Sequence, residues 1–89
     1  MEFEWDPEKD AANREKHGIG FDEAMTLWDD PNHVIVDAGY PFEARWLAIG
    51  LIRSKHWTAV FTERGTNMRI ISLRRARKKE LAEYGANQT

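Results

Sequence analysis

Residues 33–73 contain four strand-like segments that follow one another with only short turns between them. The second segment is apolar on both faces, which is typical of a central strand, and the third alternates polar and apolar residues. Because so few residues connect them, neighbouring segments are expected to pair as antiparallel hairpins. The sequence therefore predicts a mainly antiparallel sheet from His33 to Asp37, Ala44 to Arg53, His56 to Thr62 and Met68 to Leu73.

Helical segments flank these strands in the sequence. Asp6-Pro7 supplies an N-cap followed by proline at the first helical position, and Gly18 supplies a left-handed C-cap. A first helix is therefore expected to run to about Lys16-His17. Apolar residues at helical spacing predict a second helix, and a third is expected over roughly Arg74 to Tyr84. The apolar stripe of the second helix consists of Phe21, Ala24, Met25 and Trp28.

A short alternating strand from Glu2 to Asp6 completes the predicted order β-α-α-β-β-β-β-α. This order indicates an α+β domain of two layers, with two N-terminal helices and one C-terminal helix. The expected core residues occupy the apolar phase of each element: Trp5, Phe21, Met25, Trp28, Leu47, Ile49, Phe61, Ile71 and Leu81.

The length of 89 residues predicts a single domain, 1–89, in which residues 85–89 form a frayed tail. The chain has no cysteine, which excludes disulfides and thiolate metal sites. No apolar run approaches the roughly 20 residues that span a bilayer, and the first residues do not resemble a signal peptide. A cytoplasmic protein is expected.

The charge is segregated along the chain. Residues 1–44 contain three basic and twelve acidic side chains, a net charge of −9, whereas residues 45–89 contain ten basic and three acidic ones, a net charge of +7. Such asymmetry indicates either a local basic face for a polyanion or two halves that neutralise each other in the fold. We expect the halves to meet but to leave a basic cleft around Arg64, Arg69, Arg74 and Arg75, with Lys16 at its rim.

The densest basic segment leads from the last predicted strand into the last helix. Its arginines could hold phosphate oxygens with their planar guanidinium groups, and Tyr84, expected on the same helical stripe, could stack on a base. The alternative is a solvated helix whose cations pair with Glu80 and Glu83. The residues concerned are Arg69, Arg74, Arg75, Arg77, Lys78 and Lys79.

Two further motifs could carry chemistry. His17 is expected at a helix C-terminus, where the helix dipole favours its protonated form, and histidine is the usual general acid or base near neutral pH. The alternative is a simple helix cap. Glu63 and Arg64 lie at a hairpin where Glu63 could face Arg69 across the strands, either for catalysis or as an ion pair. The three histidines lack metal-binding spacing, so no metal or other cofactor is expected.

Several segments together resemble the BrnT family, the toxins of a bacterial type II toxin–antitoxin system. They occur in the family's order and cover about residues 2–84, with the weakest match at about Val36 to Ala44. The matching segments are Phe3-Glu4-Trp5-Asp6-Pro7, Asn13 with Lys16-His17-Gly18, Phe21-Asp22-Glu23-Ala24, Asp29-Asp30-Pro31, Arg45-Trp46-Leu47-Ala48-Ile49-Gly50, Val60-Phe61-Thr62-Glu63-Arg64-Gly65 and Arg69-Ile70-Ile71-Ser72-Leu73-Arg74-Arg75-Ala76.

The resemblance implies a RelE-like ribonuclease that cuts RNA without metal. It also implies a ribbon-helix-helix antitoxin, BrnA, which covers the toxin and binds operator DNA. In such chemistry the ribose 2′-hydroxyl attacks the adjacent phosphate, which requires proton transfer and cationic stabilisation. The candidates are His17, Glu63 or Tyr84 for proton transfer, Lys16, Arg64, Arg69, Arg74 and Arg75 for charge, and Arg69, Arg77 and Lys78 for RNA binding. Two other hypotheses remain: a non-catalytic nucleic-acid-binding module and a protein-interaction module.

Overall fold

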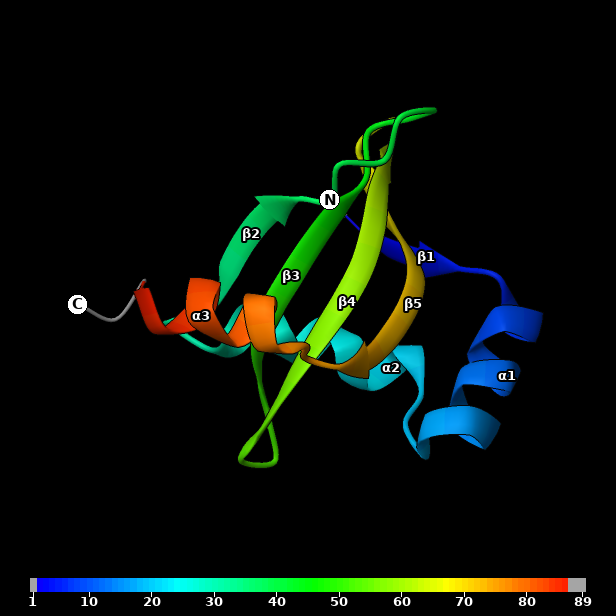
Figure 1. The fold of residues 1–89 in the computed structure, drawn as a ribbon. Helices are drawn as coiled ribbons and strands as arrows, with labels where there is room; N and C mark the ends of the chain where they lie inside the picture. Colours follow the sequence, from blue (N-terminus) through cyan, green and yellow to red (C-terminus); the bar gives the residue numbers. More distant parts are fainter. Residues whose placement is uncertain (1, 87–89) are drawn as a thin grey trace.

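The computed structural model describes residues 2–86. Its elements are β1 (Phe3–Trp5), α1 (Pro7–His17), α2 (Phe21–Ala24), the 3-10 helix η1 (Met25–Asp29), β2 (Val34–Asp37), β3 (Trp46–Ile52), β4 (Lys55–Arg64), β5 (Asn67–Arg75) and α3 (Lys78–Ala86) (Figure 1). The predicted α+β class and element order are confirmed. Helix α3 includes the first two residues of the predicted tail, and residues 87–89 lie outside the described part. No helix within residues 2–86 is long and apolar enough to cross a membrane.

The five strands form one sheet in the order β1-β5-β4-β3-β2. All neighbours are antiparallel except β1 and β5, which run parallel. A two-residue turn joins β3 to β4, and both of its residues, Arg53 and Ser54, have positive φ, at 50° and 68°. This is the backbone twist that a two-residue hairpin prefers. The antiparallel hairpins expected from the short connections are confirmed.

Helix α1 has the ends that the sequence predicts. The Asp6 carboxylate accepts a hydrogen bond from the backbone N–H of Glu8 at 2.9 Å, and Pro7 is the first helical residue. Gly18 adopts φ 72° and donates its N–H to the carbonyl of Arg14 at 2.8 Å. His17 is therefore fixed as the last helical residue, as predicted.

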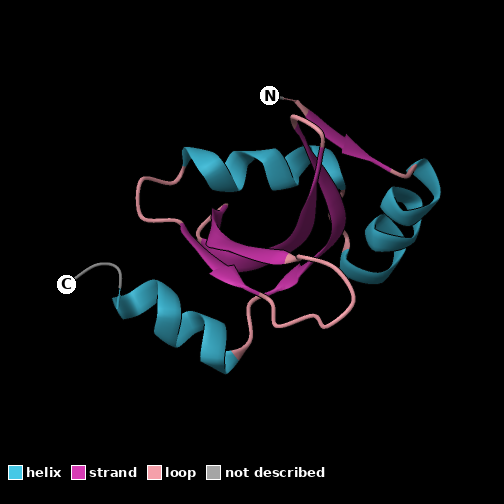
Figure 2. Ribbon diagram, turned by 90° about the horizontal axis from the view of Figure 1, so that it is seen from above, coloured by secondary structure: helices cyan, strands magenta, loops and turns pink. Residues whose placement is uncertain are grey.

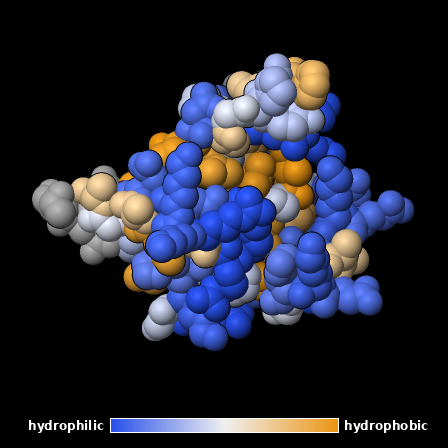
Figure 3. All heavy atoms as spheres, in the orientation of Figure 1, coloured by the Kyte–Doolittle hydropathy of each residue, from blue (hydrophilic) through white to orange (hydrophobic). Residues whose placement is uncertain are grey.

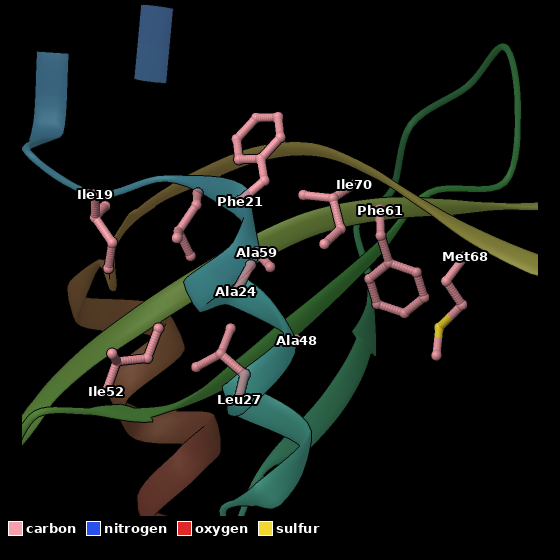
Figure 4. Packing of buried hydrophobic residues seen from close by; sticks show 11 residues of the cluster. Ile19, Phe21, Ala24, Leu27, Ala48, Ile52, Ala59, Phe61, Met68 and Ile70 are labelled. Atoms are coloured by element: carbon pink, nitrogen blue, oxygen red, sulfur yellow. The ribbon is translucent and has the colours of Figure 1, made fainter. Parts of the chain in front are cut away.

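The second helix differs from the prediction in its phase. Only one turn is α-helical, and the chain then tightens into η1, which has three residues per turn instead of 3.6. The tighter winding turns Leu27 into the core, with 0% exposure, and leaves the predicted core residue Met25 36% exposed. Figure 4 shows Phe21, Ala24 and Leu27 packed from this segment against side chains of the sheet.

A β-bulge in β5 sets the face of each side chain in the last strand. Phe61 lies opposite Ile70, but its neighbour Val60 lies opposite Ser72, so Ile71 is an extra residue in the ladder. Side chains of a strand alternate between faces, and one extra residue reverses the alternation beyond it. Leu73 therefore joins Ile70 in the core, and Arg74 emerges on the opposite face.

The helices lie on different sides of the sheet (Figure 2). The segment formed by α2 and η1 covers the face that carries the main core, and α1 packs against β5. Helix α3 lies against the other face, near β3. Its start at Lys78, later than predicted, puts Glu80 and Tyr84 in its buried phase and leaves the predicted core residue Leu81 exposed.

The seven other predicted core residues differ in how deeply they are buried. Three of them, Phe21, Ile49 and Phe61, are buried, and four are half-buried: Trp5, Trp28, Leu47 and Ile71. Trp28 packs edge-on against Phe3 and Phe61, with ring centroids 4.9 Å and 5.2 Å away. The aromatic residues thus join β1, η1 and β4 along one side of the core.

The 3-10 winding predicts unequal effects of two neighbouring truncations. Leu27→Ala removes a fully buried side chain and should cost about 2–5 kcal/mol of unfolding free energy. Met25→Ala, on the exposed side, should change it by about 0.5 kcal/mol. Urea unfolding of both variants beside the wild type measures the difference. A larger loss of unfolding free energy for Met25→Ala than for Leu27→Ala would contradict the 3-10 winding and indicate an α-helix over these residues.

Candidate active site

A basic hollow of about 380 Å³ lies between one face of α1 and the second half of β5. Helix α1 contributes Lys16 and His17, β5 contributes Ser72 and Arg74, and the loop before α3 contributes Arg77. The hollow thus collects side chains from α1 and from a segment more than fifty residues later in the chain. Its complete lining is Lys9, Ala12, Asn13, Lys16, His17, Ile71, Ser72, Arg74 and Arg77.

Asn13 fixes α1 against β5 and so positions His17. Strand β1 pairs with β5 only as far as Ile70, so the backbone N–H of Leu73 has no strand partner on that side. The Asn13 Oδ1 atom accepts this N–H at 3.1 Å, and its Nδ2 atom donates to the carbonyl of Ile19 at 2.9 Å. Because Asn13 is buried, both bonds are shielded from water, and they hold the helix end at the bulged strand.

The lining of the hollow is strongly basic. It contains the cations Lys9, Lys16, Arg74 and Arg77, and no carboxylate among its described residues. No described residue forms an ion pair with Lys9, Lys16 or Arg77. His17 is half-buried and lies among these cations. The hollow therefore suits an anion, and it places a histidine, a residue type that commonly transfers protons, beside that anion.

Arg74 is held by a buried carboxylate. Its Nη1 and Nη2 atoms donate to the two oxygens of Glu80 at 2.7 Å and 2.8 Å, the planar fork geometry of a strong ion pair. Glu80 also accepts the hydroxyl of Thr58 at 2.9 Å and the backbone N–H of Arg77 at 2.8 Å. One carboxylate thus joins β4, β5 and the start of α3, where it caps the helix from the third position.

These bonds favour the ionised form of Glu80. The hydrogen bonds from the Arg74 guanidinium lower the pKa of Glu80, burial opposes them, and the Arg77 and Thr58 donors add to the lowering, which brings the pKa to about 2. Glu80 is 7% exposed. Its charge therefore fixes Arg74 in one orientation at the edge of the hollow.

A second concavity, an apolar-floored groove of about 520 Å³, adjoins the hollow and shares Arg74 and Arg77 with it. Figure 3 shows apolar residues in a depression surrounded by hydrophilic ones. The floor comes from β2, β3 and β4, and the rim from the loop 38–45 and from α3. Its lining is Val36, Asp37, Ala38, Tyr40, Arg45, Leu47, Val60, Arg74, Arg77, Lys79, Glu80 and Glu83.

The candidates from the sequence divide into those that meet in the hollow and those that do not. Lys16, His17, Arg74 and Arg77 lie together there. Arg69 points to the same face of the sheet as Arg74, but its Nη1 atom lies 3.5 Å from a carboxylate oxygen of Glu4. Arg64, at the end of β4, and Lys78, at the start of α3, are exposed and line neither concavity.

The expected pairing of Glu63 with Arg69 is wrong. Arg69 lies opposite Thr62, whereas Glu63 lies opposite Met68, so the two side chains point to different faces of the sheet. Glu63 instead lines an apolar hollow on the face of the main core, together with Trp28 and Trp46. Alternation within the strand separates this glutamate from the basic hollow.

Arg75 and Tyr84 also lie elsewhere. Arg75 points to the face opposite Arg74, where its guanidinium carbon lies 5.6 Å from the ring centre of Trp57. Tyr84 is buried, and its hydroxyl donates to Asp30 at 2.7 Å. Burial and the neighbouring Asp30 carboxylate raise the pKa of Tyr84 to about 12. The expected stripe of Arg74 with Tyr84 is wrong, because Arg74 belongs to β5 and not to α3.

The expected basic cleft is therefore narrower than predicted. Arg74 contributes to it with Lys16 at its side, whereas Arg75 is on the other face and Arg69 is paired with an acid of the first half. An ion pair between Glu23 and Arg53 also joins the two halves. The acidic and basic halves thus meet away from the hollow and leave the hollow basic.

Lys9 was missed by the sequence reasoning, as was the positioning residue Asn13. Both have a signal in the sequence, because Lys9, Asn13, Lys16 and His17 recur at i, i+4, i+7 and i+8 on one face of α1. No sequence pattern predicts that Ser72 lines the hollow, because the bulge in β5 decides which face Ser72 occupies. No group of three or more histidine, aspartate or glutamate side chains within residues 2–86 could hold a metal ion.

Comparison with known families identifies one match. The family model described as "ribonuclease toxin, BrnT, of type II toxin-antitoxin system" matches residues 5–80. This range contains every residue that lines the basic hollow. No curated protein matches the chain.

The Glu80 clamp predicts a loss of stability in acid. The pKa of Glu80 is about 2 in the folded chain and near 4.5 when unfolded, so its contribution is present above about pH 5 and disappears as the pH falls toward 2. The loss should be on the order of 2 kcal/mol. Urea unfolding across this range, compared with Glu80→Gln, isolates it, because other carboxylates titrate in both proteins. Parallel pH profiles would contradict the assignment.

Proposed function

Because the chain belongs to the BrnT family of ribonuclease toxins of type II toxin–antitoxin systems, we propose that it cleaves RNA in the basic hollow without a metal ion. The observation that carries this proposal is the meeting of His17 with Lys16, Arg74 and Arg77 around one concavity. A phosphodiester is the anion of RNA, and the hollow offers it several cations and one histidine as a group for proton transfer.

The proposed reaction is an internal transfer. The ribose 2′-oxygen attacks the adjacent phosphorus and loses its proton, while the bond from phosphorus to the 5′-oxygen breaks and that oxygen gains a proton. The products are a 2′,3′-cyclic phosphate and a 5′-hydroxyl. His17 exchanges a proton with one of these oxygens, because it is the histidine of the hollow. Water does not enter the bond change, so the hollow has no need to bind a separate nucleophile.

The cations would stabilise the extra negative charge of the five-coordinate phosphate. Arg74 is fixed by Glu80, so it needs little reorganisation during the reaction, which is the condition for strong electrostatic stabilisation. Lys16 and Arg77 are exposed and free of ion pairs with other described residues, so they can follow the phosphate as it enters. The same cations oppose binding of a divalent metal in the hollow, which supports the metal-free mechanism.

A type II system pairs the toxin with a protein antitoxin, and we propose that this partner is a BrnA-like ribbon-helix-helix protein. In this proposal the antitoxin covers the toxin and binds operator DNA, while the toxin reaches DNA only through it. A cytoplasmic location follows from an RNA substrate and this partner. The residual basic charge of the hollow favours an acidic surface on the antitoxin.

We expect His17→Ala to abolish growth arrest and RNA cleavage while the protein stays folded. Loss of proton transfer should lower the cleavage rate by roughly 10²–10⁴-fold. The measurements are growth after induction, RNA cleavage by the purified variant, and circular dichroism as the control for folding. A folded His17→Ala protein that cleaves at the wild-type rate would place the site elsewhere.

Wild-type cleavage should also persist in excess chelator, because no step of the proposed reaction uses a metal ion. Loss of cleavage in chelator would exclude the metal-free mechanism.

Arg74 and Arg77 border the hollow, and Arg75 provides the matched control because it does not. Arg77→Ala should slow cleavage on the order of 10²-fold, because it removes a cation from the hollow. Arg75→Ala should keep most of the activity, because that side chain lies on the opposite face. Arg74 is best tested as Arg74→Ala combined with Glu80→Ala, since the single change leaves a buried carboxylate without its partner. Equal losses for Arg75→Ala and Arg77→Ala would contradict the assigned face.

A further inference from the structure

The apolar-floored groove differs in chemistry from the basic hollow beside it. Val36, Leu47 and Val60 form its floor, and these three side chains come from three neighbouring strands. The groove is lined by cations and carboxylates together, whereas the hollow is lined by cations and has no carboxylate among its described residues. The two concavities meet at Arg74 and Arg77, so a ligand held by its phosphate in the hollow can extend into the groove.

Carboxylates make the groove a poor site for a second phosphate. Glu83 and Asp37 would repel it, but both are good acceptors for N–H groups. A nucleobase carries no charge, has two apolar faces, and presents N–H donors and oxygen or nitrogen acceptors at its edge. The mixture of apolar floor, carboxylates and cations in the groove matches a nucleobase on each of these counts.

Tyr40 provides a stacking surface at the rim of the groove. The guanidinium of Arg45 lies 4.0 Å from the centre of its ring, and the Arg45 Nε atom is held by Glu43 at 2.8 Å. The loop that carries Tyr40 is fastened at both sides: the N–H of Ala38 donates to the carbonyl of Arg45, and Thr62 binds the carbonyl of Ala44. Tyrosine and arginine planes that are held in this way are the surfaces on which unpaired RNA bases stack.

We propose that this groove is a nucleobase subsite that takes the guanine of the nucleotide next to the cleaved phosphate. Tyr40 stacks on the base, and the carboxylate of Glu83 accepts its N1–H and 2-amino groups. The inference rests on the proposed function in one respect: it assumes that the phosphate of the same nucleotide lies in the basic hollow.

Glu83 is the better acceptor of the two carboxylates. One oxygen of Asp37 already accepts the backbone N–H of Gly39 at 2.7 Å, whereas no described residue forms a hydrogen bond or ion pair with Glu83. Guanine fits because two adjacent donors match one carboxylate, and its O6 and N7 atoms can accept from Lys79 or Arg45. Uracil lacks an amino group, so it would leave Glu83 with at most one of these bonds.

The first test measures nucleotide binding to the folded His17→Ala protein, which separates binding from cleavage. Guanosine, inosine and uridine 5′-monophosphates are titrated while the methyl signals of Val36, Leu47 and Val60 are followed by NMR. Inosine monophosphate differs from guanosine monophosphate only in lacking the 2-amino group. We expect shifts at these methyl groups and about tenfold tighter binding of the guanosine nucleotide, the effect of one hydrogen bond to a charged group. Equal affinities, or shifts absent from the groove, would overturn the subsite.

Variants assign the roles of the two residues in the same titration. Glu83→Ala should make the guanosine and inosine nucleotides bind equally. Tyr40→Ala should weaken both about tenfold, and Tyr40→Phe, which keeps the ring, should restore them. The matched control is Asp29→Ala, which removes an exposed carboxylate from η1, on the other face of the sheet. A tenfold preference that survives Glu83→Ala would assign the base to another site.

The second test maps the nucleotides beside the cuts that the active protein makes in a mixed-sequence RNA. Guanosine should be enriched next to the cut, and Glu83→Ala should remove the enrichment from the cuts that this variant makes. Cleavage without any guanosine preference in the wild type would overturn the subsite and leave the proposed ribonuclease intact. If no RNA is cleaved at all, the proposed function fails, and the nucleotide titration still decides whether the subsite exists.

Discussion

One extra residue in β5 determines which side chains of the last strand reach the core and which reach the surface used by the site. The bulge at Ile71 reverses the alternation of the strand, so that Leu73 is buried and Arg74 points away from the core. A regular strand would place Ser72 opposite Ala59, where Leu73 now fills the core, and Arg74 opposite Trp57, where Arg75 now lies on the other face. The bulge therefore satisfies packing and site geometry together, and the position of the hollow depends on it.

The bulge would be of little use without two polar contacts that fix the elements around it. Asn13 replaces a missing strand at Leu73 and brings the end of α1 with His17 to β5. Glu80 holds Arg74 from the other side and starts α3 at the same point. Both side chains are buried, so their hydrogen bonds are not exchanged readily with water. Two short polar contacts thus give a small chain a defined site without a large core.

The sequence predicts the fold better than it predicts the site, and particular residues show why. The caps at Asp6 and Gly18 act within one turn, so they are local and were placed correctly. The convergence of His17 with Arg74 was also expected, although the register that produces it was not. Face assignments failed at Glu63 and Arg75, because the first needed the pairing register and the second the bulge. The core phase failed at Met25, where tertiary packing turned an α-helical pattern into a 3-10 helix. Each error concerns which side of an element faces inward, a property that long-range pairing decides.

The charges that are segregated in the sequence are arranged in the fold so that some cations are paired with acids and others are not. Acids of the first half neutralise Arg53 and Arg69 of the second half, away from the hollow. Arg74 forms its ion pair with Glu80, an acid of its own half. Lys16 and Arg77 form no ion pair with another described residue. A phosphate next to Arg74 would contact a guanidinium that is already ordered. The Glu80 carboxylate on the far side of that guanidinium offsets the free-energy cost of its desolvation. The same carboxylate lines the neighbouring groove, where it weakens the attraction for a second phosphate. Glu80 therefore adds negative charge to the groove and at the same time orders a cation of the hollow, so the two concavities differ in chemistry although they share Arg74.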